Sequence, residues 1–171
     1  MAYTSIMRML GVDPGLTTVG LGLIEIHPHS EPRVIEWLTI ETDSGLPLPE
    51  RLRELADDFG SFLKEAKPDL AVVEKIFFAK NKRTAIETAH ARGVLLATLA
   101  LQGIDIIEIT PAELKMAITG DGTADKKQMQ TMVKRMLKLK EIPTPADAAD
   151  GLALALYGAC TKNARSFGKN A

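Results

Sequence analysis

The sequence contains little cysteine and few aromatic residues. Its 171 residues include one cysteine, Cys160, and aromatic residues make up 5% of the chain. A single cysteine excludes an internal disulfide and a cysteine-based zinc site, and it argues against a disulfide-stabilised scaffold. Hydrophobic residues make up 46% of the chain and charged residues 25%, which is ordinary for a globular domain with a sizeable core. A disordered or fibrous chain is therefore excluded.

Long apolar runs are absent as well. No run approaches the roughly 20 residues that a helix needs to cross a bilayer. The N-terminal residues also lack the basic and apolar regions of a secretory signal. We therefore expect a cytoplasmic protein with no membrane segment.

The charge is balanced overall but unevenly distributed along the chain. Residues 1–74 contain six basic and thirteen acidic residues, whereas residues 75–140 contain twelve basic and six acidic residues. A basic segment of this kind is either a solvated surface or a surface for a polyanion such as nucleic acid. The charge pattern alone leaves both interpretations open.

Hydrophobic periodicity predicts one α/β domain around a mixed sheet. Strands are expected to end at Asp13 and to cover 19–26, 34–40, 70–74 and 104–109, and the first three form an antiparallel meander. Gly20 and Gly22 suit a close backbone approach or a bulge. Helices are expected at 48–66, 84–102, after Thr110, at 124–139 and from Thr144 onward. We expect residues 161–171 to form a mobile tail.

Four acidic residues occupy related positions in this pattern. Asp13 and Glu74 each end an apolar strand, and Asp147 and Asp150 are three residues apart near the start of the last helix. Taken singly, Asp13 is an ordinary turn residue and a helix-start aspartate is an ordinary cap. If the four converge, each close pair repels by about 4 kcal/mol at an effective dielectric constant of 20. Two Mg²⁺ or Mn²⁺ ions would balance such a cluster and support phosphodiester cleavage.

The helix expected at 84–102 is apolar nearly all round in its second half. Such a helix lies either at the centre of the core or in an interface with another subunit, and its small residues permit close packing. Before it, two adjacent aromatic residues, Phe77 and Phe78, fall in a basic segment without a clear period. One of the two rings could equally be a core residue.

Five segments together resemble the RuvC-type Holliday junction resolvases. They are Gly11-Val12-Asp13-Pro14-Gly15, Val73-Glu74-Lys75-Ile76-Phe77, Phe78-Ala79-Lys80-Asn81, Ala91-Arg92-Gly93-Val94 and Ala146-Asp147-Ala148-Ala149-Asp150-Gly151-Leu152-Ala153. Each segment is modest by itself, but their order and spacing are specific. The resemblance covers residues 7–160, which we take as a single domain.

This resemblance implies a ribonuclease-H-like fold, with a five-stranded mixed sheet of three antiparallel and two parallel strands flanked by helices. It implies a homodimer that works with the RuvA/RuvB branch-migration complex and nicks two opposed strands of a four-way DNA junction in recombination and repair. The cofactor would be Mg²⁺, two ions per active site, with Mn²⁺ as a substitute. The catalytic metal ligands would be Asp13, Glu74, Asp147 and Asp150.

The resemblance also implies residues that contact the DNA. An aromatic ring, Phe77 or its neighbour Phe78, would unstack bases near the junction centre. Basic residues would contact phosphates at Lys80, at Lys115 and at one of the adjacent Lys126 and Lys127. Which member of each adjacent pair has the role stays open.

Three other functions remain as alternatives. The turn after Asp13 contains Gly15, Thr17 and Thr18, as in ATP-binding proteins of the sugar-kinase and actin type, but those proteins need two such lobes. A module that binds junctions without cutting them is a second alternative. The third is a nuclease of the same fold that acts on RNA:DNA hybrids.

Overall fold

The computed structural model describes residues 6–28, 30–76 and 82–167, and these form a five-stranded mixed sheet. The strands are β1 (Met7–Asp13), β2 (Thr18–Ile26), β3 (Arg33–Glu41), β4 (Leu70–Glu74) and β5 (Asp105–Ile109), in the spatial order β3-β2-β1-β4-β5. The first three pair antiparallel, and β4 pairs parallel with both β1 and β5. The predicted fold class is confirmed.

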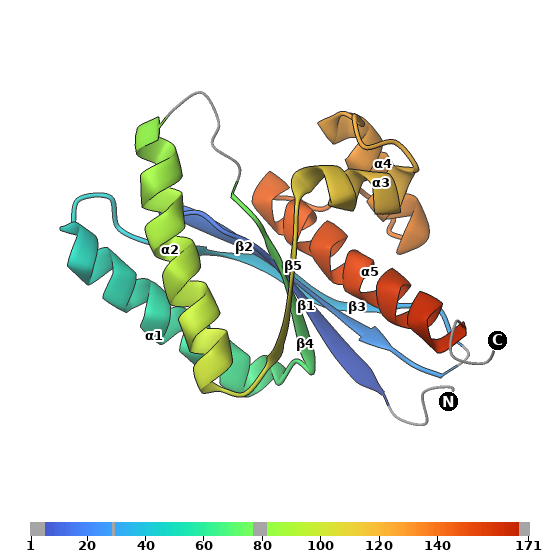
Figure 1. Ribbon diagram of the computed structural model, residues 1–171, viewed down its shortest axis with the longest axis horizontal. Helices are drawn as coiled ribbons and strands as arrows, with labels where there is room; N and C mark the ends of the chain where they lie inside the picture. The colour runs from blue at the N-terminus through green and yellow to red at the C-terminus, as the bar shows by residue number, and fades with distance from the viewer. Residues whose placement is uncertain (1–5, 29, 77–81, 168–171) are drawn as a thin grey trace.

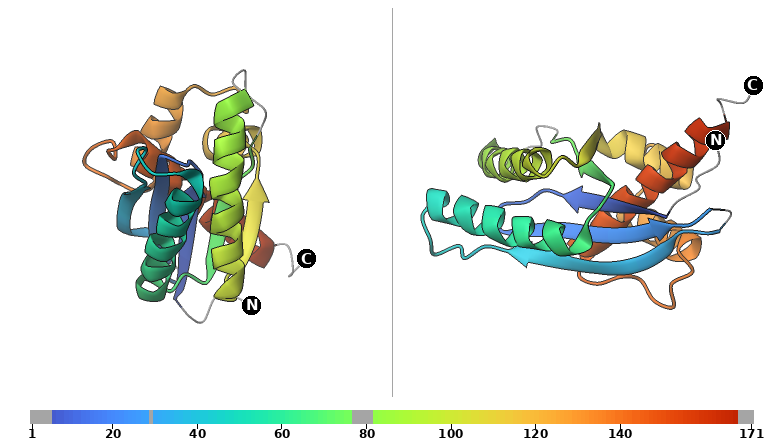
Figure 2. Two further views of the ribbon diagram at one scale, coloured as in Figure 1. Left: turned by 90° about the vertical axis from the view of Figure 1, so that its left-hand side faces the viewer. Right: turned by 90° about the horizontal axis from the view of Figure 1, so that it is seen from below.

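Helices cover both faces of the sheet. Helices α1 (Leu48–Ala66) and α2 (Lys82–Leu101) lie side by side on one face (Figure 1). On the other face, α5 (Ala146–Phe167) crosses β1 and β2, and α3 (Pro111–Thr119) and α4 (Lys126–Met136) pack against it. The turned views in Figure 2 show the sheet between the two groups of helices.

The alternation of side chains along the strands creates two hydrophobic cores. In β4, Leu70 and Val72 pack on the α5 face, whereas Ala71 and Val73 pack on the α1 and α2 face. All four are buried, as expected for a strand covered on both faces. Because β1 and β4 lie between other strands and between two helical layers, their ends are held rigidly.

Glycines allow α5 to approach the sheet at backbone distance. A Cβ atom placed on Gly11 would lie 1.9 Å from the carbonyl oxygen of Gly151, and one on Gly22 would lie 2.3 Å from the nitrogen of Leu152. Contacts this short are not possible, so only glycine fits at these positions. The close approach expected for the glycines of β2 is confirmed.

Several helix boundaries differ from the sequence expectation. Helix α4 begins at Lys126 because Asp125 caps it in a capping box with Gln128, and it ends at Met136 rather than at 139. Helix α5 continues to Phe167, so the first residues of the segment 161–171 are helical. No helix among the described residues is long and apolar enough to span a membrane.

Helix α2 is not at the centre of the core. Its Leu95 and Leu99 side chains are buried against the sheet, but Ile86 is 55% exposed and the segment beyond Leu99 ends in Leu101, which is 87% exposed. Between them, the same outer face presents Ala89, Gly93 and Ala97. The prediction that this helix lies at the centre of the core is therefore wrong. The structure shows a helix with a partly apolar outer face.

Candidate active site

Asp13 and Glu74 emerge at the same edge of the sheet. Each is the last residue of its strand, and β1 and β4 are parallel neighbours in which Val12 pairs with Val73. The two carboxylates therefore leave the sheet from adjacent strands in the same direction, as at the carboxyl ends of other parallel strands.

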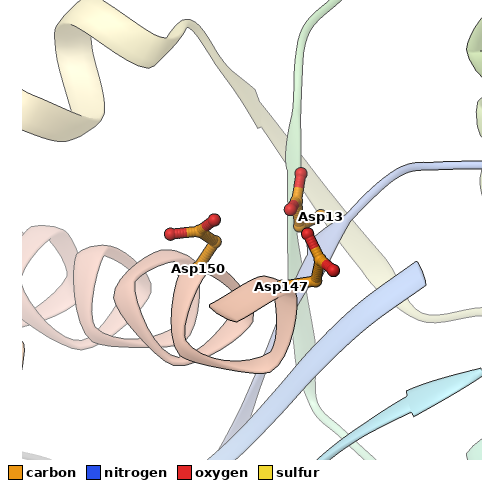
Figure 3. Close-up of side chains that lie close together, drawn as sticks. All are labelled: Asp13, Asp147 and Asp150. Carbon is orange, nitrogen blue, oxygen red and sulfur yellow. The ribbon is translucent and has the colours of Figure 1, made fainter. Parts of the chain in front are cut away.

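Asp147 and Asp150 come to this edge from α5. Both lie in the first turns of the helix, one turn apart, and the helix N-terminus lies over the end of β1 and the start of β2. One carboxylate oxygen from each of Asp13, Asp147 and Asp150 lies within 4.8 Å of the other two. Figure 3 shows the three side chains close together, with Asp13 beside Asp147.

A pocket of about 210 Å³ opens at this cluster. Glu74 lines it together with Asp13 and Asp150, so the fourth acid faces the same space. Its other walls come from α3 and α4, through Lys115, Lys126, Pro111, Leu114 and Met129. The pocket is therefore lined by both carboxylates and lysines.

The electrostatics of the pocket act most strongly on Asp13. Burial and the neighbouring carboxylates of Glu74, Asp150 and Asp147 raise its pKa from 3.8 to about 8. Lys126 opposes this change without cancelling it. In the absence of cations, Asp13 is therefore protonated at neutral pH, because the folded protein disfavours a further negative charge there.

The pKa values of two other acids are raised for the same reasons. For Glu74, burial has the largest effect, followed by the charge of Asp150, while Lys115 acts in the opposite direction. For Asp150, burial again dominates, and a hydrogen bond from Lys126 offsets part of it. The Lys126 Nζ lies 3.1 Å from the Asp150 Oδ2.

The donor set fits a hard divalent cation. The cluster consists of carboxylates alone, without histidine or cysteine, which is the chemistry of magnesium and manganese sites. A divalent ion would also offset the burial and the repulsion that together raise the pKa of Asp13. An acidic cluster beside lysines can thus bind metal and a phosphate group together.

The sequence matches one protein family over most of its length. Residues 9–158 match the family model of the crossover junction endodeoxyribonuclease RuvC. The RuvC of Thermotoga petrophila is 46% identical over 159 residues, which are 93% of this chain and 96% of the relative. The RuvC of Brevibacillus brevis is 43% identical over 150 residues, 88% of this chain and 90% of the relative.

This chain belongs to the RuvC family. Among solved structures, Thermus thermophilus RuvC superposes with a TM-score of 0.84 at 30% identity, over 92% of this chain and 96% of that one. The same protein in complex with a Holliday junction substrate matches with the same TM-score over 91% of this chain and 94% of that one. A yeast mitochondrial Holliday junction resolvase shares the fold at 14% identity, with a TM-score of 0.66.

The lysines expected at the DNA from the resemblance to the RuvC family have different surroundings in the structure. Lys115 and Lys126 line the acidic pocket. Lys127 instead lines a separate cavity between α3 and α4, so the two adjacent lysines have different surroundings. Phe77, Phe78 and Lys80 lie outside the described residues.

Two residues next to this RuvC-family site were not among the site residues predicted from the sequence. Gly20 lies where the backbone of Asp147 touches β2, and its signal was a glycine inside an apolar strand. Arg92 donates from Nε to the carbonyl oxygen of Glu74 at 3.0 Å. Its signals were its place in the middle of a mostly apolar helix and in the segment Ala91-Arg92-Gly93-Val94, which contributed to the family resemblance.

Proposed function

We propose that this protein is a structure-specific DNA endonuclease that resolves four-way (Holliday) junctions by paired, symmetric, metal-dependent nicks. The observation that carries the proposal is the convergence of Asp13, Glu74, Asp147 and Asp150 on one edge of the sheet, at a pocket that two lysines also line. Membership of the RuvC family and the likeness to Thermus thermophilus RuvC in complex with a junction support the substrate. The biological setting would be homologous recombination and DNA repair in the cytoplasm.

The four acids are the proposed metal ligands and catalytic residues. They would hold two Mg²⁺ ions, or Mn²⁺ in their place, with Asp13 at the centre of the acidic cluster. Bound metal supplies activation of water and stabilisation of the leaving oxygen in phosphodiester hydrolysis. Asp13 must first release its proton, since its pKa is about 8 without cations.

The lysines and the aromatic pair are the proposed DNA contacts. Lys115 and Lys126 face the acids and would neutralise the phosphate that is cut. Lys127 and Lys80 would bind flanking phosphates. Phe77, with Phe78 as the alternative, would stack on bases at the junction centre, where stacking contributes about 1 to 3 kcal/mol per base.

Two symmetric incisions require two active sites, so we propose a homodimer formed through α2. Its outer face presents the exposed Ile86 and, two and three turns later, the small residues Gly93 and Ala97. A two-fold interface would use this same face of both chains and fix the distance between the two sites. Cooperation with the RuvA/RuvB branch-migration complex is proposed from family membership alone.

The proposal is tested with a synthetic four-way junction. Purified protein in Mg²⁺ or Mn²⁺ should nick two opposed strands symmetrically and leave ends that ligase can seal. Asp13→Asn should bind the junction without cutting it, because the phosphate contacts of the lysines remain. Phe77→Ala should impair cutting more than binding, and Phe78→Ala is its matched control.

The same assay separates the alternatives. Junctions that stay intact with well-folded wild-type dimer in either metal would leave a module that binds without cutting. Faster cutting of an RNA:DNA hybrid than of the junction would indicate the hybrid nuclease. Either result contradicts the proposed function.

A further inference from the structure

An arginine from α2 contacts the backbone of Glu74, one of the proposed metal ligands. Arg92 is in the middle of the helix, and its side chain is only 19% exposed. Its guanidinium group extends to the ends of two parallel strands, where Nε donates to the carbonyl oxygen of Glu74 at 3.0 Å and Nη2 pairs with the carboxylate of Glu108. Glu74 ends β4, and Glu108 is the next-to-last residue of β5.

Stability alone gives a weak reason for this arrangement. Burial lowers the pKa of Arg92, so removing its charge from water has a free-energy cost. The ion pair with Glu108 is only partly buried, since the Glu108 side chain is 41% exposed, and such pairs contribute little to stability. Apolar residues on the same face of α2, such as Leu95 and Leu99, already hold the helix against the sheet. The position of the guanidinium at the end of β4 points to a more specific role.

The contact of Arg92 with Glu74 is at the point where the backbone leaves the sheet. The amide of Lys75 still bonds to the carbonyl oxygen of Ile109 at 2.7 Å, on the β5 side. The carbonyl of Glu74 is held by Arg92 from α2. The carbonyl of Glu74 and the amide of Lys75 belong to the same peptide group. Because both are hydrogen-bonded, the orientation of this peptide plane next to the Cα of Glu74 is fixed. The direction of the Glu74 side chain depends on that plane, because the Cβ direction follows the backbone.

We propose that Arg92 is a positioning residue that fixes the backbone of Glu74 and so directs its carboxylate toward Asp13 and Asp150. This inference rests on the proposed function, in which Glu74 is a metal ligand. Glu108 orients the guanidinium from the neighbouring strand. The arrangement is an outer support for a ligand, of the kind whose loss lowers metal affinity by about 10- to 100-fold in other proteins.

A chemically matched arginine elsewhere in the sheet provides a control. Arg8, at the start of β1, also joins a carboxylate to a backbone carbonyl, since it pairs with Glu25 at 3.3 Å and donates to the oxygen of Ala66 at 2.9 Å. It lies at the opposite end of β1 from Asp13. Arg8→Met therefore removes the same kinds of bond without touching the site.

The test is calorimetric titration of Mn²⁺ into metal-free protein without DNA, for wild type, Arg92→Met, Arg8→Met and Glu108→Gln. Arg92→Met should bind Mn²⁺ about tenfold more weakly. Arg8→Met should bind it as wild type does, even if both variants lower Tm equally. Glu108→Gln should have a smaller effect than Arg92→Met, because the bond from Arg92 to Glu74 remains.

Junction cutting adds a second measurement. Arg92→Met should need more Mg²⁺ for half-maximal rate and recover much of the wild-type rate at high Mg²⁺, with unchanged junction affinity in EDTA. If Arg92→Met does not fold, Arg92→Lys is measured in its place. Its single ammonium group can keep the pair with Glu108 but cannot also reach the carbonyl of Glu74. A purely structural arginine predicts normal Mn²⁺ affinity for Arg92→Lys, whereas a positioning role predicts weaker affinity.

Two results would overturn the inference: wild-type Mn²⁺ affinity in Arg92→Met, or an equal loss of affinity in Arg8→Met. Failure of the proposed function looks different. In that case wild-type protein leaves junctions intact, while Arg92→Met still weakens Mn²⁺ binding relative to Arg8→Met.

Discussion

Asp13 pairs with Gly20 across β1 and β2, and a Cβ atom on Gly20 would lie 1.9 Å from the carbonyl oxygen of Asp147. The strand residue opposite the central acid is thus the residue on which the start of α5 rests. The absence of a side chain there lets Asp147 come close enough to join Asp13. The geometry of the acidic cluster therefore depends on a glycine that has no chemistry of its own.

Substituting this glycine should damage both stability and the site. In Gly20→Ala the new methyl group meets backbone, which cannot move aside as a flexible side chain can, so α5 must shift. We expect the free energy of unfolding to fall by at least ~3 kcal/mol, the upper part of the usual range for overpacking. Metal affinity should fall as well, as measured by Mn²⁺ titration at a temperature where the variant is folded.

Gly60→Ala is the matched control for this substitution. A Cβ atom on Gly60 would make only ordinary contacts, 3.8 Å from the Thr98 Cγ2, and the residue lies inside α1, where alanine is favoured over glycine by about 1 kcal/mol. This variant should keep Mn²⁺ affinity and lose no stability. A Gly20→Ala protein as stable as wild type, with normal metal affinity, would show that α5 adapts to the methyl group.

The raised pKa of Asp13 predicts a pH-dependent stability in EDTA. The folded pKa is about 8 and the ordinary value is 3.8, so Asp13 contributes stability that is fully present below pH 4 and is lost as pH rises through 8. Asp13→Asn lacks this charge, so its Tm should exceed that of wild type by an amount that is small near pH 5 and grows up to pH 9. A tenfold change in proton affinity is worth about 1.4 kcal/mol. We therefore expect a difference of about 4 °C or more.

Thermal unfolding across pH 5 to 9 measures this difference, and saturating Mg²⁺ should remove it by favouring the ionised wild-type site. A Tm gap between the two proteins that does not change with pH would mean that Asp13 titrates normally.

Lys126 and Lys127 should differ in their effect on the pH dependence of cutting. Lys126 lowers the pKa of Asp13 and Asp150, so its loss should raise both and move the rising limb of the pH–rate profile to higher pH. Lys126→Met should therefore be most impaired near neutral pH and recover partly at alkaline pH. Lys127→Met, which removes the same group one residue away, should lower the rate at all pH values without moving the profile. Parallel profiles for the two variants would contradict the prediction.

A charge on the outer face of α2 should separate the proposed dimer. Gly93→Arg places a long cationic side chain into open space, so the chain should still fold. Two such charges facing each other across a two-fold interface repel. Sedimentation should then show monomers, and cutting should become single-strand nicking. Ser61→Arg, which adds the same charge at an exposed position of α1, should stay dimeric. A dimeric Gly93→Arg protein would place the interface elsewhere.

The sequence predicted the elements of this fold well, because their signals are local. Strand β4 is a continuous apolar run, and the capping box of Thr110 with Glu113 marks the start of α3. The ends of α4 were less predictable, because Asp125 and Gln128 form a second capping box inside a segment that also reads as helix. The exposure of α2 was not predictable either, since an apolar helix looks the same whether a sheet or another chain covers it.

The sequence by itself determined which groups are available for metal and DNA binding. These are four carboxylates at the ends of two strands and the start of a helix, and a basic segment. Tertiary structure decided which of these groups meet. It brought Lys126 rather than Lys127 to the acids, because α4 turns one lysine toward α5 and the other away. It also gave Gly20 and Arg92 their places beside Asp147 and Glu74, through contacts between residues far apart in the chain. Such contacts leave no periodic signal, because they depend on how helices and sheet pack and not on any one segment.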